Sequence, residues 1–134
     1  MRKVLLPLAL AAALAGLTLA AGNVRSAEPQ AELGTDLMQA VDDSNKSLSS
    51  NISLKDAKAS AADARDINQA FIQVEAYFAA RPDAQDAVDL AKKTRELTDK
   101  IARLVDKGDF DAAADSATAL SRTCRTCHTF YKKS

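Results

Sequence analysis

The chain has 134 residues with 18 basic and 18 acidic side chains; 47% of the residues are hydrophobic, only 4% are aromatic, and tryptophan is absent. This balanced charge excludes the strongly basic surface that is typical of nucleic-acid binding, so no nucleic acid is expected as a partner. The alanine-rich composition allows one small domain with a thin core, which leaves room for a bound group in the interior.

Residues 1–27 have the pattern of a secretory signal peptide. Met1-Arg2-Lys3 is a short positive start, and the 18 residues from Val4 to Ala21 are almost wholly apolar. Cleavage is expected between residues 20 and 27, and the alternative is an uncleaved membrane helix. The prediction is therefore export to the periplasm, without a stable membrane anchor, of a domain over residues 28–134. Its 15 basic and 18 acidic residues give a net charge near minus three.

Four stretches with helical spacing follow the signal peptide, and none alternates as a strand does. The first covers about residues 35–51, although the serines and asparagines in its second half favour caps and turns. Ser53 and Asp56 together resemble a capping box and predict the start of the second helix, which ends before Pro82.

Asp83 is the expected N-cap of the third helix, which ends in basic residues before Gly108, and Asp109 begins the fourth. Connections of a few residues make neighbouring helices antiparallel, so the sequence predicts an all-α, antiparallel, up-and-down four-helix bundle. The fourth helix has an unbroken heptad seam that turns its cysteines inward, formed by Phe110, Ala113, Ala117, Leu120, Cys124, Cys127 and Tyr131.

The last helix carries both cysteines of the chain and its one histidine in the spacing Cys124-x-x-Cys127-His128. This spacing predicts covalent attachment of a c-type haem. Residues three apart lie on one face of a helix, so both thiols can reach the two vinyl groups along one edge of a porphyrin. The adjacent imidazole then becomes the proximal ligand of the iron.

Haem-free interpretations fit the motif less well. Zinc would need a fourth ligand beyond two cysteines and one histidine, which only a carboxylate could supply. A thioredoxin-like dithiol is expected at a helix N-terminus in a strand-helix-strand setting, and a disulfide this close on one helix would stabilise little. A haem-free helical module that uses its thiols for metal or redox chemistry stays open as a third hypothesis.

At this point the sequence resembles the class II c-type cytochromes, which include the cytochromes c prime and their low-spin relatives. The family's tail pattern, C-x-x-C-H-x-x-aromatic-basic, corresponds to Cys124, Cys127, His128, Tyr131 and Lys132, with lysine where arginine is more usual. The resemblance covers the mature chain in architecture and is specific in sequence only over this tail. It implies a four-helix bundle with haem c covalently bound to the last helix.

The resemblance also implies that the distal iron ligand comes from the first helix. Met38 lies there and is the expected sixth ligand, with ordinary core filling as the alternative. If Met38 does not bind iron, Val41 or Asn45, one and two turns further on, is expected to cap an open site.

The expected function is that of a soluble periplasmic electron carrier and not of an enzyme. The alternative is a five-coordinate cytochrome c prime that binds or buffers small gases such as nitric oxide. Periplasmic redox proteins are the expected partners, attracted by basic residues around the motif (Arg122, Arg125, Lys132 and Lys133), although solvated helix surface also explains these charges. A homodimer is a further option, because dimerisation through the first two helices is common in the family.

Overall fold

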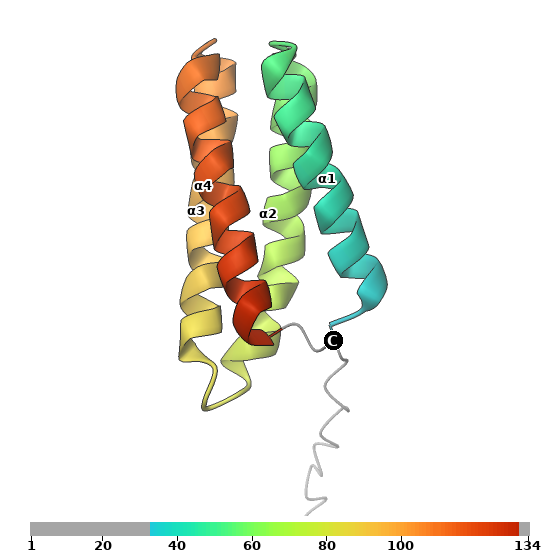
Figure 1. Cartoon of the computed structure of the whole chain (residues 1–134), viewed down its shortest axis with the longest axis vertical. Helices are drawn as coiled ribbons and strands as arrows, with labels where there is room; N and C mark the ends of the chain where they lie inside the picture. Colours follow the sequence, from blue (N-terminus) through green and yellow to red (C-terminus); the bar gives the residue numbers. More distant parts are fainter. Residues whose placement is uncertain (1–32, 132–134) are drawn as a thin grey trace, which may run out of the picture.

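The computed structural model describes residues 33–131, which form four α-helices and contain no strand (Figure 1). These are α1 (Thr35–Ser53), α2 (Ala57–Ala79), α3 (Gln85–Asp106) and α4 (Phe110–Tyr131). The predicted all-α fold and four-helix bundle are confirmed. The predicted signal peptide at residues 1–27 lies outside the described residues, as do Lys132 and Lys133.

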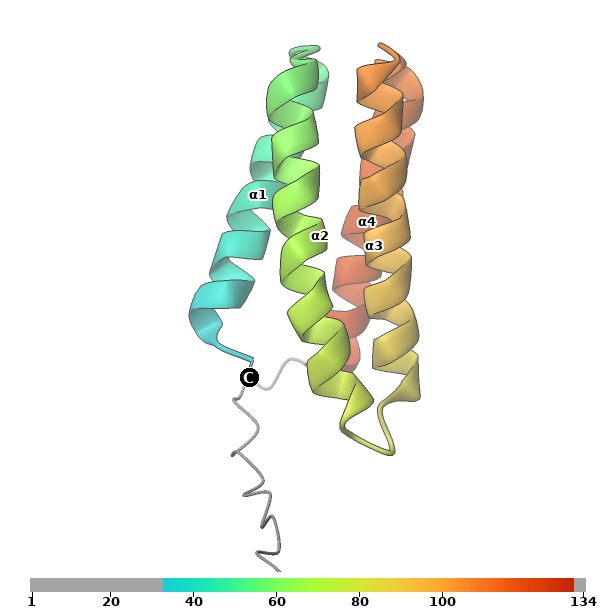
Figure 2. The same cartoon turned by 180° about the vertical axis from the view of Figure 1, so that it is seen from behind.

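Successive helices run in opposite directions, with α2 packed between α1 and α3, and α4 packed mainly against α3 (Figures 1 and 2). The contact between α1 and α4 is the sparsest of those that close the bundle. Towards its N-terminus, α1 leans away from the other helices in both views. None of the helices within residues 33–131 combines the length and apolar character that crossing a bilayer needs.

The junction between α1 and α2 differs from the prediction. The polar stretch remains helical to Ser53, and side chains such as Ser49 and Ser53 donate to carbonyls four residues earlier, at 3.1 and 2.9 Å, so their hydroxyls are used within the helix and not as caps. Ser53 therefore ends α1 and does not begin α2. Asp56 is the N-cap of α2, and its Oδ1 accepts a hydrogen bond from the Ala59 amide at 2.9 Å.

The start of α3 also differs from the prediction, whereas that of α4 agrees. Ala84, and not Asp83, occupies the N-cap position of α3, and Asp86 in the first turn accepts a bond from the Ala87 amide at 3.0 Å. The Asp109 carboxylate accepts from the Ala112 amide at 3.2 Å, which confirms the predicted start of α4. Gly108 has φ +77°, a left-handed conformation that favours glycine in the turn before it.

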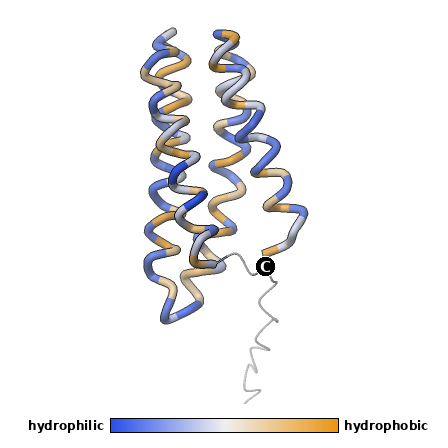
Figure 3. Tube along the Cα trace, viewed as in Figure 1, coloured by the Kyte–Doolittle hydropathy of each residue, from blue (hydrophilic) through white to orange (hydrophobic). Residues whose placement is uncertain are grey.

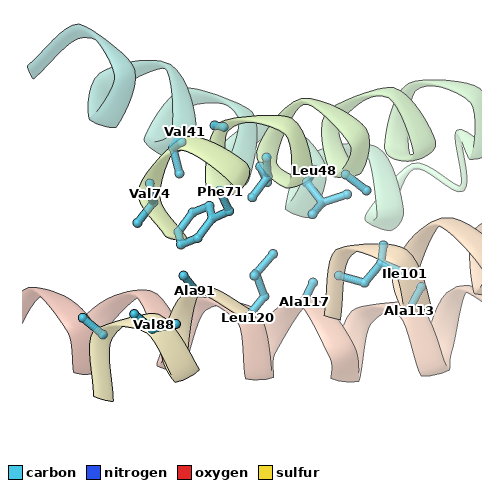
Figure 4. Packing of buried hydrophobic residues seen from close by; sticks show 14 of the residues in the cluster. Val41, Leu48, Phe71, Val74, Val88, Ala91, Ile101, Ala113, Ala117 and Leu120 are labelled. Atoms are coloured by element: carbon cyan, nitrogen blue, oxygen red, sulfur yellow. The ribbon is translucent and has the colours of Figure 1, made fainter. Parts of the chain in front are cut away.

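The core is a narrow apolar seam that runs the length of the bundle between the four helices (Figures 3 and 4). Leu48, Ile67, Ile101 and Leu120 are fully buried, one from each helix, and small residues such as Ala91 and Ala117 lie between the larger ones. The buried hydroxyls of Thr94 and Thr123 donate to carbonyls of their own helices, so these polar groups are satisfied.

The N-cap of α2 provides a test of the revised helix boundary. Asp56→Ala is expected to lower the free energy of unfolding by about 1 kcal/mol, because the amides of the first turn lose their acceptor. In urea unfolding the midpoint should fall while the slope stays constant. Asp66→Ala, an exposed change later in α2, is the matched control and should have little effect. Equal stabilities of the two variants would contradict the boundary.

Candidate functional site

The predicted attachment motif lies in the last two turns of α4, at the end of the bundle where α1 begins and where α2 joins α3 (Figure 1). Cys124 and Cys127 are free thiols and both are half-buried. The heptad seam predicts that these thiols turn inward, and in the structure both lie at the edge of the core. On α4 the fully buried positions, which include Leu120 and Thr123, belong to the turns that precede them.

Each thiol is affected by a carboxylate on a different neighbouring helix. Burial is the main cause that raises the pKa of Cys124 from 9.0 to about 11, with smaller contributions from Cys127 and from Asp42 of α1. Burial also raises the pKa of Cys127, together with the charge of Asp86 on α3. These contributions agree with a position of Cys124 near α1 and of Cys127 near the start of α3.

The register between α1 and α4 follows from one hydrogen bond, in which the Asn45 amide of α1 donates to the Ser121 hydroxyl of α4 at 3.4 Å. The pair formed by Asp42, three residues before Asn45, and Cys124, three residues after Ser121, agrees with this register, because the charge of Asp42 is among the smaller causes that raise the pKa of Cys124. All α-helices have the same rise per residue, so in an antiparallel pair equal numbers of residues counted backwards on α1 and forwards on α4 reach the same height along the bundle. Four residues before Asp42 is Met38, and four residues after Cys124 is His128. Met38 and His128 therefore lie at the same height.

His128 is exposed and lies on the flank of α4 that faces α1. It follows Cys124 by four residues and Ser121 by seven, which are spacings that keep residues on one face of a helix. The structure therefore brings His128 onto the same arc as the thiols.

Met38 is half-buried and packs against the core cluster from the N-terminal half of α1. It precedes Asp42 by four residues and Asn45 by seven, so it belongs to the face of α1 that meets α4. Met38 lies in the N-terminal half of α1, and towards its N-terminus α1 leans away from the other helices (Figure 1). Val41, three residues after Met38 on α1, is buried, and the Oδ1 of Asn45 is buried without a hydrogen-bond partner among the described residues.

One feature of the site was missed by the sequence analysis. The Tyr131 hydroxyl donates a hydrogen bond to the Asp86 carboxylate, which raises the pKa of Tyr131 to about 12. The Tyr131 ring also packs against Phe78 of α2, with the ring centroids 4.9 Å apart. The tail pattern includes an aromatic residue at position 131, but no sequence periodicity indicates that its hydrogen-bond partner is an aspartate 45 residues earlier.

The geometry argues against a redox-active dithiol. Such thiols have a lowered pKa and gain from the positive end of a helix dipole, whereas these two have a raised pKa and lie at a C-terminus. Within residues 33–131, no group of three or more histidine, cysteine or acidic side chains is arranged to hold a metal ion. Cys124, Cys127 and His128 share one arc of α4, and Met38 lies on α1 at the level of His128.

A comparison of the chain with family models, curated proteins and solved structures finds no significant match. The arguments about this site therefore depend on its own residues.

The raised pKa of the thiols predicts slow alkylation of the folded, haem-free chain. Thiolate is the reactive form, so Cys124 should reach half of its maximal rate near pH 11, whereas the chain unfolded in urea should do so near pH 9.0. The pKa of Cys124 is higher in the folded chain than in the unfolded chain. Its contribution to the free energy of unfolding is therefore complete below pH 9.0 and is lost as the pH rises through about 11.

Mass spectrometry of tryptic peptides measures the alkylation of each cysteine separately, since Arg125 lies between them. Identical rates in the folded and unfolded chain would contradict the burial.

Proposed function

We propose that this protein is an exported monohaem c-type cytochrome that carries electrons, with haem c bound through Cys124 and Cys127. His128 is the proximal iron ligand and Met38 is the sixth ligand. We also propose that it is a class II c-type cytochrome, on the basis of the resemblance over the tail of the chain, and that it is located in the periplasm. The expected partners are periplasmic redox proteins.

The observation that carries the proposal is the placement of the Cys-x-x-Cys-His motif. The two thiols are free, lie three residues apart on one arc of α4 and are half-buried at the edge of an apolar seam. The histidine follows on the flank of the same arc. This arrangement fits a flat apolar group with two attachment points on one edge, and the high pKa of the thiols does not fit dithiol exchange.

Support for Met38 comes from the level of this residue on the facing helix. The hydrogen bond between Asn45 and Ser121 supports a level for Met38 opposite His128, on the face of α1 towards α4. A group between these helices would have an imidazole donor on one side and a thioether donor on the other. Buried residues of α2, such as Phe71 and Phe78, would exclude water from the apolar side.

A haem held by these residues would supply reversible one-electron transfer at its iron. The chain's own contribution is to choose the ligands and the surroundings. A thioether donor stabilises ferrous iron and raises the reduction potential relative to a second imidazole. The alanine-rich interior adds to this effect, because a site with low polarity disfavours the more highly charged ferric form.

The second candidate is a five-coordinate cytochrome c prime that binds small gases. The observation that favours it is the lean of α1, which carries the half-buried Met38 away from α4, while the aliphatic side chain of Val41 is more deeply buried (Figure 1). If Val41 and not Met38 covers the distal side, the iron keeps an open position. The absorption spectrum of the ferric protein separates the two functions. An electron carrier should show low-spin iron with a methionine charge-transfer band, and a gas-binding cytochrome should show high-spin iron.

The proposed function is tested by expressing the full chain in a bacterium that attaches haem to its own exported cytochromes. The periplasmic fraction should yield a coloured protein whose reduced spectrum in alkaline pyridine is that of a c-type haemochrome, with one haem per chain. A protein that is purified colourless from cells that load their other cytochromes would overturn the proposal.

A further inference from the structure

The last turn of α4 needs an anchor, because it carries Cys127 and His128 close to the end of the helix. The final carbonyls of a helix have no partner within it, and helix ends open locally more easily than their centres. Hydroxyls of Thr126 and Thr129 donate to Arg122 and Arg125 carbonyls of α4 itself, at 3.0 and 2.9 Å. Those bonds do not join this turn to another helix.

Tyr131 connects this turn to α3 and to α2. Its hydroxyl donates to Asp86 of α3, and its ring lies edge-on against the buried ring of Phe78 of α2. Phe78 is itself held by Tyr77, at 5.0 Å between centroids, and the guanidinium of Arg81 lies 3.5 Å from the centre of the Tyr77 ring. The end of α4 is therefore anchored to a packed aromatic cluster at the α2–α3 turn.

Asp86 has a fixed orientation for this contact. It lies in the first turn of α3, where the same Oδ1 that accepts the Tyr131 hydroxyl also accepts the Ala87 amide at 3.0 Å. The positive end of the α3 dipole favours a carboxylate in this turn. An acceptor that is fixed by its own backbone can determine where Tyr131 lies.

Tyr131 follows Cys127 by four residues and His128 by three, so all three lie on neighbouring parts of one helical face. Rotation of the last turn that moved Tyr131 away from Asp86 would move the thiol and the imidazole by the same angle. We propose that Asp86 and Tyr131 are positioning residues for the attachment motif, whose hydrogen bond fixes the rotation of the last turn and thereby the placement of Cys127 and His128. This inference rests on the proposed function and assigns to it two residues outside the motif.

The first test uses the haem-loaded protein and four variants. Tyr131→Phe keeps the ring and removes the hydroxyl, and Asp86→Ala removes the acceptor. Both should keep one haem per chain but lose about half or more of the methionine-to-iron charge-transfer band at neutral pH, because His128 no longer holds one orientation. Asp86→Asn keeps an acceptor oxygen and should restore the band. Tyr77→Phe, the matched control in the adjacent aromatic residue, should leave it unchanged.

The second test needs no haem. In the leaderless chain with both thiols free, Tyr131→Phe should raise the alkylation rate of Cys127 about fivefold, the factor that one hydrogen bond typically supports, with a smaller change at Cys124. This variant keeps the Asp86 charge, so the pKa contribution of that charge stays in place. A fifth variant, in the haem-loaded protein of the first test, combines Tyr131→Phe with Asp86→Ala and should add little further loss of the methionine band, since both changes remove the same bond.

The outcomes separate the two proposals. A colourless wild type overturns the proposed function, and the alkylation rates then still decide whether the bond holds the last turn. A loaded wild type overturns the positioning role alone if Tyr131→Phe matches it in both the methionine band and the Cys127 rate. A Tyr77→Phe variant with the same loss as Tyr131→Phe also overturns it, because the effect would then follow from the loss of either tyrosine hydroxyl at this end of the bundle and not from the bond to Asp86.

Discussion

Replacement of Met38 by alanine is expected to convert a low-spin, six-coordinate iron into a high-spin, five-coordinate one. The methionine charge-transfer band of the ferric protein should disappear, and the reduced protein should bind carbon monoxide, which the wild type should exclude. The reason is positional, because Met38 lies on the face of α1 towards α4 and level with His128. Absorption spectra of the oxidised and reduced protein, with and without carbon monoxide, measure the change.

Leu37→Ala is the matched control for this variant. Leu37 is the neighbouring residue of α1, is half-buried and packs against the same core cluster, so its truncation costs comparable packing but removes no donor to iron. Its spectrum should stay low-spin. A wild type that is already high-spin, or a Met38→Ala variant that keeps the methionine band, would favour the gas-binding function and remove Met38 from the ligand set.

Replacement of both Cys124 and Cys127 by alanine is expected to abolish covalent haem while leaving the fold intact. Both thiols are half-buried at the edge of the core, and alanine has a higher helix propensity than cysteine, so the far-ultraviolet circular dichroism should stay that of a four-helix bundle. Haem staining of the denatured chain on a gel should fall from a strong band to background. Each single replacement should keep at most one thioether bond, with a haemochrome maximum shifted from that of the wild type.

Thr126→Ala is the control for these cysteine variants. Thr126 lies between the two cysteines, is exposed, and bonds only to a carbonyl of its own helix among the contacts described for it. Its haem band should equal that of the wild type. A double cysteine variant that still carries haem through denaturation would show that the bond to the chain is made elsewhere.

The number and order of the helices could be predicted because apolar residues recur at helical spacing and because proline and glycine separate the stretches. Asp109 and Gly108 are strong local signals, and the start of α4 agrees with them. The errors occurred where several polar residues compete for one cap. Ser53 is a good cap by type, but it donates within α1, and Asp56 is the residue whose side chain reaches an amide of the first turn of α2.

The motif itself could be predicted from spacing, since Cys124, Cys127 and His128 are adjacent in sequence and on one helix. The depth of the thiols could not, because a heptad seam does not show where a bundle ends, and here the turns before Cys124 are more deeply buried. The level of Met38 needed the contact between Asn45 and Ser121, which are 76 residues apart. The bond between Tyr131 and Asp86 also joins distant positions, and it depends on how α3 begins.

A docking surface formed by the basic residues around the motif remains a prediction. Arg122 and Arg125 are exposed on α4, and the other two predicted members of this group lie beyond the described residues. Acidic residues, including Asp42 and Asp86, lie on the neighbouring helices, so the charge at this end of the bundle is mixed.

The intact mass of the exported chain tests the central claim most directly. After purification from a host that makes c-type cytochromes, and after extraction with acidified acetone to remove unattached haem, the protein should have the mass of the processed polypeptide plus one haem. Digestion should place that addition on the peptide that contains Cys124, Cys127 and His128. A mass equal to the polypeptide alone, with both thiols free to react, would contradict the account.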